Sequence, residues 1–208
     1  MPNNSQLHEN PLMNKKVIIE SQRIVYDDFF QIEEAYVRRT RFDGTLSEPL
    51  RILNFERGHG AAALVFNTET ERVILINQFR YPTYANGQGP GWIVEVMAGM
   101  LNPGEDPQQA IRREIMEEAG YQVNELTPIA TFYPSPGGSS ECLFLYYAEV
   151  DNRHKIASGG GLAVEHEDIE IVEYSLPEAW QALAAGQIVD AKTLIALMWL
   201  REKLKEQS

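Results

Sequence analysis

Cysteine is nearly absent from this chain of 208 residues, in which Cys142 is the one thiol. A single cysteine excludes an internal disulfide framework. It lies in the apolar run 142–148, so we expect it to be a buried core residue. Sparse use of cysteine fits a reducing compartment, and we therefore expect a cytoplasmic protein.

Long apolar stretches are missing as well. No run of about 18 apolar residues occurs, so we expect no transmembrane helix and no membrane partner. Residues 1–14 are polar and rich in asparagine, without the apolar stretch of a signal peptide, and are expected to form a flexible tail. The hydrophobic content of 44% is that of an ordinary globular protein, and we find no internal repeat.

Basic residues are scarce, because 18 Lys and Arg face 30 Asp and Glu and leave a formal net charge of −12. A broad nucleic-acid surface needs clustered Lys and Arg, so we expect no nucleic-acid partner. Nine of the 30 acids fall within residues 99–120 and 165–170. Such clustering is expected of a metal site, although solvated acidic loops have the same pattern.

The amino-terminal part has the residue pattern of β-structure. Strands are expected over residues 16–26, 29–40 and 49–56. The Asp43-Gly44 pair is a hairpin signal between the last two of these strands. So few strands need a partner surface, and we therefore predict that residues 15–57 form an N-terminal antiparallel β-element that dimerises.

Residues 58–208 are predicted to form the second domain. Its expected strands are 61–67, 72–79, 92–98, 125–134, 141–149 and 169–175. Ser175 begins a capping box for a short helix that ends near Gly186, and Asp190 is the cap of a last helix that ends near residue 206. The pattern predicts an α/β fold in which helices flank a mixed sheet, an α/β/α sandwich.

A further helix is expected over residues 106–120. Asp106 is a natural N-cap, Pro107 suits the first helical position, and Gly120 suits a left-handed residue after the helix. Gly99 stands shortly before this helix in the sequence.

Three carboxylates of this helix, Glu114, Glu117 and Glu118, stand at positions i, i+3 and i+4 and share one face. Like charges at this spacing destabilise a helix, and a bound cation would remove that cost. Hard oxygen ligands suit Mg²⁺ or Mn²⁺. The alternative is an acidic surface helix whose partners are Arg112 and Arg113.

The whole stretch reads Gly99-x5-Glu105-x7-Arg113-Glu114-x2-Glu117-Glu118-x-Gly120. It resembles the Nudix box of Nudix hydrolases, and departs from it at Tyr121, where an aliphatic residue is usual. The resemblance implies a Nudix fold and hydrolysis of a nucleoside diphosphate linked to another moiety. It also implies Mg²⁺, replaceable by Mn²⁺, on the three box glutamates and the carbonyl of Ala98, with Glu105 and Arg113 paired.

Over residues 22–203 the chain resembles ADP-ribose pyrophosphatases of this superfamily. An acidic loop in those enzymes supplies a catalytic base and a metal ligand. Alignment on the Gly-Leu-Ala of residues 161–163 implies Glu165 as the base and Glu167 as the additional ligand. Glu167 and Asp168 are alternatives for the base, and a solvated loop is the alternative for the whole segment.

The same resemblance implies five substrate-binding residues: Arg80, Phe29, Arg57, Glu95 and Glu141. Phe29 would stack on the base from the partner subunit. Structural alternatives exist for several of them. Arg80 could be a surface residue near a turn, Glu95 and Glu141 buried and paired acids, and Phe29 a core aromatic.

Three features bear on the substrate. Pro136 follows Gly120 by sixteen residues and resembles a marker of ADP-ribose pyrophosphatases; the alternative is a tight turn made by Pro-Gly-Gly. Ile52 stands where a second basic residue beside Arg51 is typical. The segment 188–195 is shared with nucleotide-sugar pyrophosphatases, including those that act on GDP-mannose.

We therefore expect Mg²⁺-dependent hydrolysis of ADP-ribose to AMP and ribose 5-phosphate by a cytoplasmic homodimer. The alternative is a nucleotide-sugar pyrophosphatase of GDP-mannose type or of broad range. A third possibility is a Nudix-fold ligand sensor without catalysis, a class that usually loses box glutamates.

Overall fold

The computed structural model describes residues 15–206, so the tail predicted for residues 1–14 lies outside the described part. The chain forms two compact units. Of the described residues, the first unit comprises 15–58 with 135–141, and the second comprises 59–134 with 142–206.

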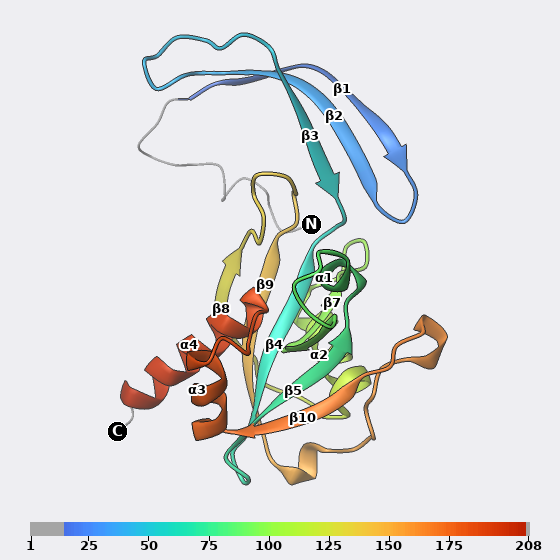
Figure 1. The fold of residues 1–208 in the computed structure, drawn as a ribbon, viewed down its shortest axis with the longest axis vertical. Coiled ribbons are helices and arrows are strands. Elements are labelled where there is room, and N and C mark those ends of the chain that lie inside the picture. The colour runs from blue at the N-terminus through green and yellow to red at the C-terminus, as the bar shows by residue number, and fades with distance from the viewer. Residues whose placement is uncertain (1–14, 207–208) are drawn as a thin grey trace. The chain divides into compact units, whose positions relative to one another are not determined.

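The first unit contains a three-stranded antiparallel sheet in the order β1-β2-β3 (Figure 1). Its strands are β1 (Val17–Asp27), β2 (Gln31–Arg39) and β3 (Leu50–Glu56). Asp43 forms the predicted turn between β2 and β3, because its carboxylate accepts the N–H and the hydroxyl of Thr45. The segment 135–141 joins β3, since Phe55 N donates to Gly138 O at 2.8 Å.

The second unit is built on a seven-stranded sheet. Its strands are β4 (Gly60–Asn67), β5 (Arg72–Phe79), β6 (Trp92–Glu95), β7 (Met97–Met100), β8 (Thr127–Phe132), β9 (Leu143–Val150) and β10 (Glu170–Ser175). The main order is β10-β5-β4-β9-β8, with β6 paired to β5 and β7 paired to β4. The β4–β9 pair is parallel and the others are antiparallel, so the sheet is mixed, as predicted.

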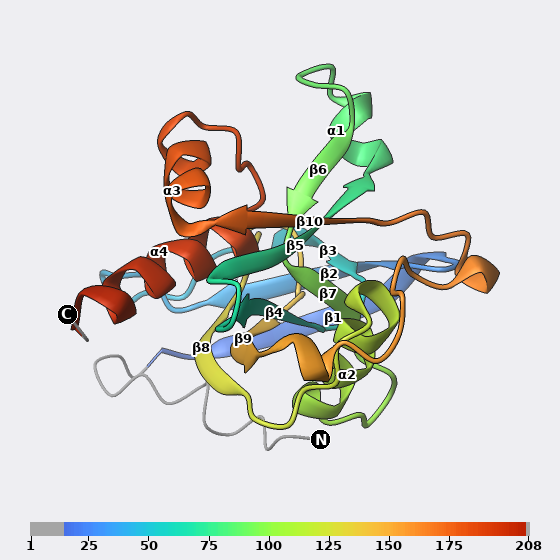
Figure 2. The same cartoon turned by 90° about the horizontal axis from the view of Figure 1, so that it is seen from below.

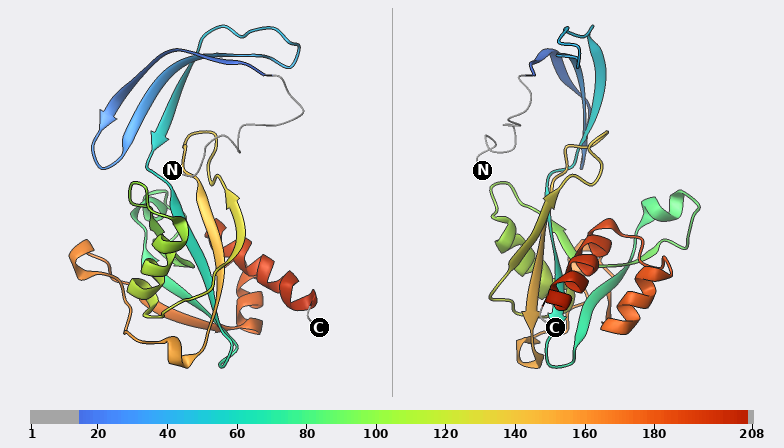
Figure 3. Two further views of the ribbon diagram at one scale, coloured as in Figure 1. Left: turned by 180° about the vertical axis from the view of Figure 1, so that it is seen from behind. Right: turned by 90° about the vertical axis from the view of Figure 1, so that its left-hand side faces the viewer.

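Helices cover both faces of this sheet. They are α1 (Tyr81–Ala85), α2 (Pro107–Glu114), the π-helix η1 (Ile115–Ala119), the 3₁₀ turns η2 (Asn152–His154) and η3 (Ala163–Glu165), α3 (Leu176–Ala184) and α4 (Ala191–Glu206). Figure 2 and Figure 3 show α2 on one face and α3 with α4 on the other. The predicted α/β/α sandwich is therefore confirmed. None of the helices within residues 15–206 combines the length and the apolarity that a membrane crossing requires.

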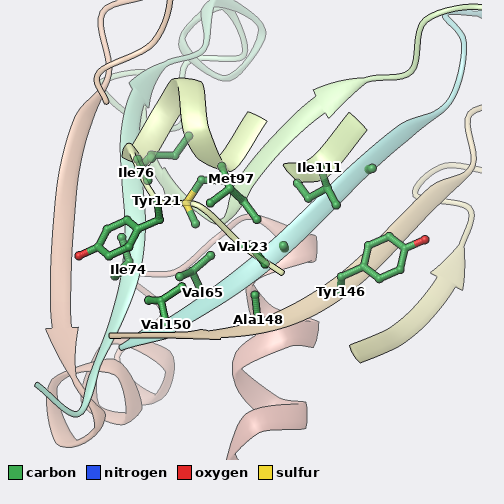
Figure 4. Close-up of a cluster of buried hydrophobic side chains, with 14 of the residues drawn as sticks. Val65, Ile74, Ile76, Met97, Ile111, Tyr121, Val123, Tyr146, Ala148 and Val150 are labelled. Carbon is green, nitrogen blue, oxygen red and sulfur yellow. The ribbon is translucent and has the colours of Figure 1, made fainter. Parts of the chain in front are cut away.

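Two apolar layers hold the helices to the sheet. Side chains alternate along a strand, so β4 contributes to both layers. Ala61, Ala63 and Val65 pack against α2. Leu64 and Phe66 point to the other face and pack against α3 and α4. Figure 4 shows the first layer, in which Ile111 of α2 packs among the β4, β5 and β9 side chains. A strand buried on both faces needs a continuous apolar sequence, and β4 has one.

Two predicted elements differ from the structure. The strand expected over 92–98 is split into β6 and β7, because Val96 donates its N–H to the hydroxyl of Thr193 in α4 at 2.8 Å instead of to a strand. The helix expected over 106–120 is α-helical only to Glu114 and continues as a π-helix. The short helix α1 was not predicted at all.

Candidate functional site

The carboxylates of the predicted metal site lie on α2 and η1, which together form the box helix, residues 107–119. The Asp106 carboxylate caps it by accepting the N–H groups of Gln108 and Gln109, as predicted. Gly120 ends it with φ of +73°, in the left-handed conformation expected for this position. The switch to a π-helix at Ile115 widens the turn that carries the acids, and such π segments are frequent at functional sites.

Glu118 is the most deeply buried acid of the box helix, with 2% of its surface exposed. Its Oε2 accepts the N–H of Ala98 at 3.1 Å, which joins the helix to β7. Burial, and then the charge of Glu114, raises the pKa of Glu118 to about 9. A carboxylate held in this environment is stabilised when a cation binds beside it.

Glu114 packs directly against the backbone of β7. A Cβ atom at Gly99 would lie 1.9 Å from Glu114 Oε1, so a larger residue here would push the Glu114 carboxylate out of its place. Burial raises the pKa of Glu114 to about 6, and the nearby guanidinium of Arg113 opposes the shift. The fixed glycine of the box motif therefore makes the space that the Glu114 carboxylate occupies.

Arg113 links the acids of the box helix to one another. Its Nη1 donates to Glu114 at 2.7 Å and to Glu117 at 3.1 Å. Its Nε lies 3.5 Å from Glu105, the pair implied by the resemblance. Glu105 in turn accepts the N–H of Asn102, so these contacts fix the loop before the helix.

The acids fit a hard divalent cation in kind, although they are not arranged as a cage. Within residues 15–206, no three His, Cys, Asp or Glu side chains have the arrangement of a metal cluster. Two of the three box glutamates, Glu114 and Glu117, instead form ion pairs with the Arg113 guanidinium. Negative charge from Glu114, Glu167 and Glu95 nevertheless converges on Glu118, whose pKa it raises in addition to burial. A divalent cation would offset this repulsion with the oxygen ligands that Mg²⁺ prefers.

The second acidic segment, residues 159–169, is called the acid loop below. Glu165 lies in η3 and His166 ends that turn in the left-handed conformation. Glu167 Oε2 accepts the N–H of Leu162 at 2.9 Å, which folds the loop back on itself. The charge of Glu167 raises the pKa values of both Glu114 and Glu118, after the effect of burial, so the loop brings this acid to the box helix.

Arg80 and Lys192 both pair with Glu95, which is buried, whereas Arg80 is partly exposed. Arg80 Nε donates to Glu95 at 2.7 Å, and Lys192 Nζ contacts the other oxygen of Glu95 at 3.2 Å. Lys192 also pairs with Asp190, the cap of α4, at 2.7 Å. The sequence analysis did not predict Lys192. The only sequence feature that points to it is its place in segment 188–195, which resembles nucleotide-sugar pyrophosphatases.

The remaining predicted substrate residues belong to the first unit. Phe29 is 77% exposed, which excludes the alternative of a core aromatic in this chain, and its ring packs edge-on against Phe30 at 4.5 Å. Arg57 lies 3.6 Å from Glu141 and 5.5 Å above the Phe30 ring. Arg51, beside the unusual Ile52, is bound to Glu34 at 2.5 Å.

Comparison with known proteins identifies relatives along nearly the full chain. A family model described as NUDIX domain matches residues 56–197. GDP-mannose pyrophosphatases of Escherichia coli K12 and Cronobacter sakazakii are 35% and 38% identical to this chain over 189 residues. Each alignment covers 91% of this chain and 97% of the relative.

A solved structure described as an ADP compounds hydrolase has the same fold. Its TM-score is 0.69, and the match covers 93% of this chain and 96% of that chain. The two sequences are 22% identical, so this likeness concerns the fold alone.

Proposed function

The chain belongs to the Nudix family and is a pyrophosphohydrolase, and on that premise we propose that it hydrolyses the diphosphate bridge of GDP-mannose or a closely similar nucleotide sugar. The products from GDP-mannose would be GMP and mannose 1-phosphate. One observation carries this choice: GDP-mannose pyrophosphatases align with 91% of this chain at 35% identity. The comparisons therefore favour the alternative of the sequence analysis over ADP-ribose.

The residues of the box helix have a defined part in this proposal. Glu114, Glu117 and Glu118, with the Ala98 carbonyl and Glu167, would hold Mg²⁺ or Mn²⁺. The cation, when bound, neutralises the diphosphate and lowers the pKa of an attacking water. The Arg113 guanidinium contacts Glu114 and Glu117 and offsets part of their negative charge.

The acid loop would supply the proton acceptor. Glu165 takes a proton from the attacking water, a step that contributes about 10²–10⁴ in rate. Glu167 and Asp168 are the alternatives if the alignment is shifted. Arg80, held by Glu95, would contact the substrate phosphates or ribose. Phe29 of the partner subunit would stack on the base, and Arg57 and Glu141 are further expected substrate-binding residues.

ADP-ribose is the second candidate substrate. Pro136 supports it, because a proline at this spacing resembles the marker of ADP-ribose pyrophosphatases. Ile52 opposes it, because the chain lacks the second basic residue that is typical beside Arg51. The two substrates differ in base and sugar and share the diphosphate, so the box helix does not distinguish them.

A substrate panel tests the choice. The purified protein is assayed with Mg²⁺ on GDP-mannose, ADP-ribose, UDP-glucose and diadenosine compounds, and the products are identified by chromatography. We expect GMP from GDP-mannose at a higher kcat/KM than AMP from ADP-ribose. The reverse order would replace GDP-mannose by ADP-ribose, and no release of a nucleoside monophosphate would reject both.

We further propose a homodimer formed through the three-stranded sheet. Large apolar side chains of this sheet are exposed, among them Val17 at 64%, Ile19 at 59% and Tyr26 at 55%. Several large apolar side chains left exposed on one small sheet are expected of an interaction surface. Light scattering that finds a monomer at micromolar concentration would reject the dimer, and with it base stacking by Phe29 across subunits.

A further inference from the structure

A segment that begins at Lys155 is docked on the carboxyl end of the box helix. All four carbonyl groups of residues 117–120 accept hydrogen bonds from it: Glu117 O from Gly161 N (3.1 Å), Glu118 O from Gly160 N (2.8 Å), Ala119 O from Lys155 Nζ (2.8 Å) and Gly120 O from Ile156 N (2.9 Å). The last carbonyls of a helix have no partner within the helix. Here residues 155–161, which include the start of the acid loop, supply a partner to each of these carbonyl groups.

The contact leaves no room for a side chain between the two backbones. Gly159 has φ of +71°, and a Cβ atom on it would lie 2.6 Å from Glu118 O. The start of the acid loop therefore touches the backbone of the most buried box glutamate. Any movement of the loop at this point changes its position relative to the carboxylates of the helix.

The rest of the acid loop is tied to this docked start. Leu162 donates its N–H to the Glu167 carboxylate at 2.9 Å, and Glu167 N donates to Leu162 O at 3.3 Å. Ile169 N donates to Gly160 O at 3.3 Å. The position of Glu167 is thus set by Leu162, and Leu162 directly follows Gly161, which is hydrogen-bonded to the box helix.

Lys155 is the charged side chain in this contact. A cation at the carboxyl end of a helix is favoured by the helix dipole. Lys155 Nζ also lies 4.8 Å from the centre of the Tyr121 ring, within the range of a cation–π interaction. Lys155 and Tyr121 additionally form a backbone bridge. Tyr121, the residue at which the box departs from the usual aliphatic side chain, is thus in contact with Lys155.

We propose that Lys155 is a positioning residue that locks the acid loop onto the box helix and so sets the distance between loop and helix carboxylates. The inference rests on the proposed function, because its effect on catalysis presumes a base on the loop. Lys155 acts through the loop and not through substrate contacts. Its removal therefore lowers kcat and leaves KM unchanged.

The test compares Lys155→Met with the control Lys205→Met, which removes the same charge from an exposed site on α4. Misplacement of a catalytic group by about 1 Å costs up to about 10²-fold in rate, so we expect Lys155→Met to lose about 10- to 100-fold in kcat. Lys155→Arg keeps the charge and a donor and retains most of the activity. Amide hydrogen exchange at Gly160 and Gly161, measured by NMR, becomes faster in Lys155→Met alone.

Two results would overturn the inference. One is unchanged kcat together with unchanged exchange at Gly160 and Gly161 in Lys155→Met. The other is a raised KM with normal kcat, which would make Lys155 a substrate contact. If Lys155→Met does not fold, Tyr121→Leu removes the ring partner and keeps an apolar side chain at the buried position, and the same readouts decide.

The exchange measurement also separates this inference from the proposed function. A wild-type protein inactive on every nucleotide sugar would reject the proposed substrate class. Exchange at Gly160 would still report whether Lys155 holds the loop on the helix, because it needs no substrate.

Discussion

Replacing Glu118 by glutamine should stabilise the metal-free protein at neutral pH although it abolishes turnover. Burial raises the pKa of Glu118 in the folded chain to about 9, against 4.5 for an ordinary glutamate. The folded state therefore binds this proton more tightly than the unfolded state. The protonated Glu118 side chain therefore contributes its full stability below pH 4.5. This contribution is lost as the carboxyl group ionises between pH 4.5 and pH 9.

The magnitude follows from the two pKa values. Each pH unit between them removes ~1.4 kcal/mol of stability, so the loss at pH 7.5 is on the order of 4 kcal/mol. Glutamine cannot ionise, and its side-chain carbonyl can still accept the Ala98 N–H. In a domain of this size ~1 kcal/mol shifts Tm by about 2–4 °C, so the variant should melt clearly higher in EDTA at pH 7.5.

The assay is thermal or urea unfolding in EDTA from pH 5 to pH 8.5 for both proteins. We expect the stability of the wild type to fall faster with pH than that of Glu118→Gln, and the two curves to converge near pH 5. Added Mg²⁺ should stabilise the wild type and leave the variant unchanged. Parallel curves at all pH values would refute the account of Glu118 as a buried carboxyl group that a cation relieves.

Three further predictions concern the loop, the glycine contact and the core. Glu165→Gln should lower kcat by about 10²–10⁴ with unchanged metal affinity, and unchanged turnover would move the base to Glu167 or Asp168. Gly99→Ala should reduce activity and Tm together, because its Cβ would lie 1.9 Å from Glu114 Oε1; a normal Tm by calorimetry would contradict the close packing. Leu64→Ala, at a fully buried β4 position, should cost about 2–5 kcal/mol in urea unfolding, and a cost below ~1 kcal/mol would contradict that packing.

Much of the fold was predictable because its signals are local. The apolar runs of β4 and β5, the Asp106 cap and the Ser175 capping box each depend on residues a few positions apart. The split between β6 and β7 was not predictable in this way. It depends on Thr193, which is 97 positions from Val96 along the chain.

In the candidate site, too, features with local sequence signals could be predicted and features that depend on long-range contacts could not. The box carboxylates could be found because their spacing within one helix is fixed by the motif. The π-helix that carries Glu117 and Glu118 has no comparable residue signature. Lys155 and Lys192 contribute through contacts with Ala119 and Glu95, which the fold brings close from distant parts of the sequence.

The central claim is that the carboxylates of the box helix bind the divalent cation. Electron paramagnetic resonance of Mn²⁺, titrated into wild type and into the double variant Glu114→Gln with Glu118→Gln, measures this binding without substrate. We predict that the wild type binds Mn²⁺ and that the double variant binds it at least ~10-fold more weakly. Equal Mn²⁺ affinity in the two proteins, at unchanged fold, would contradict the claim.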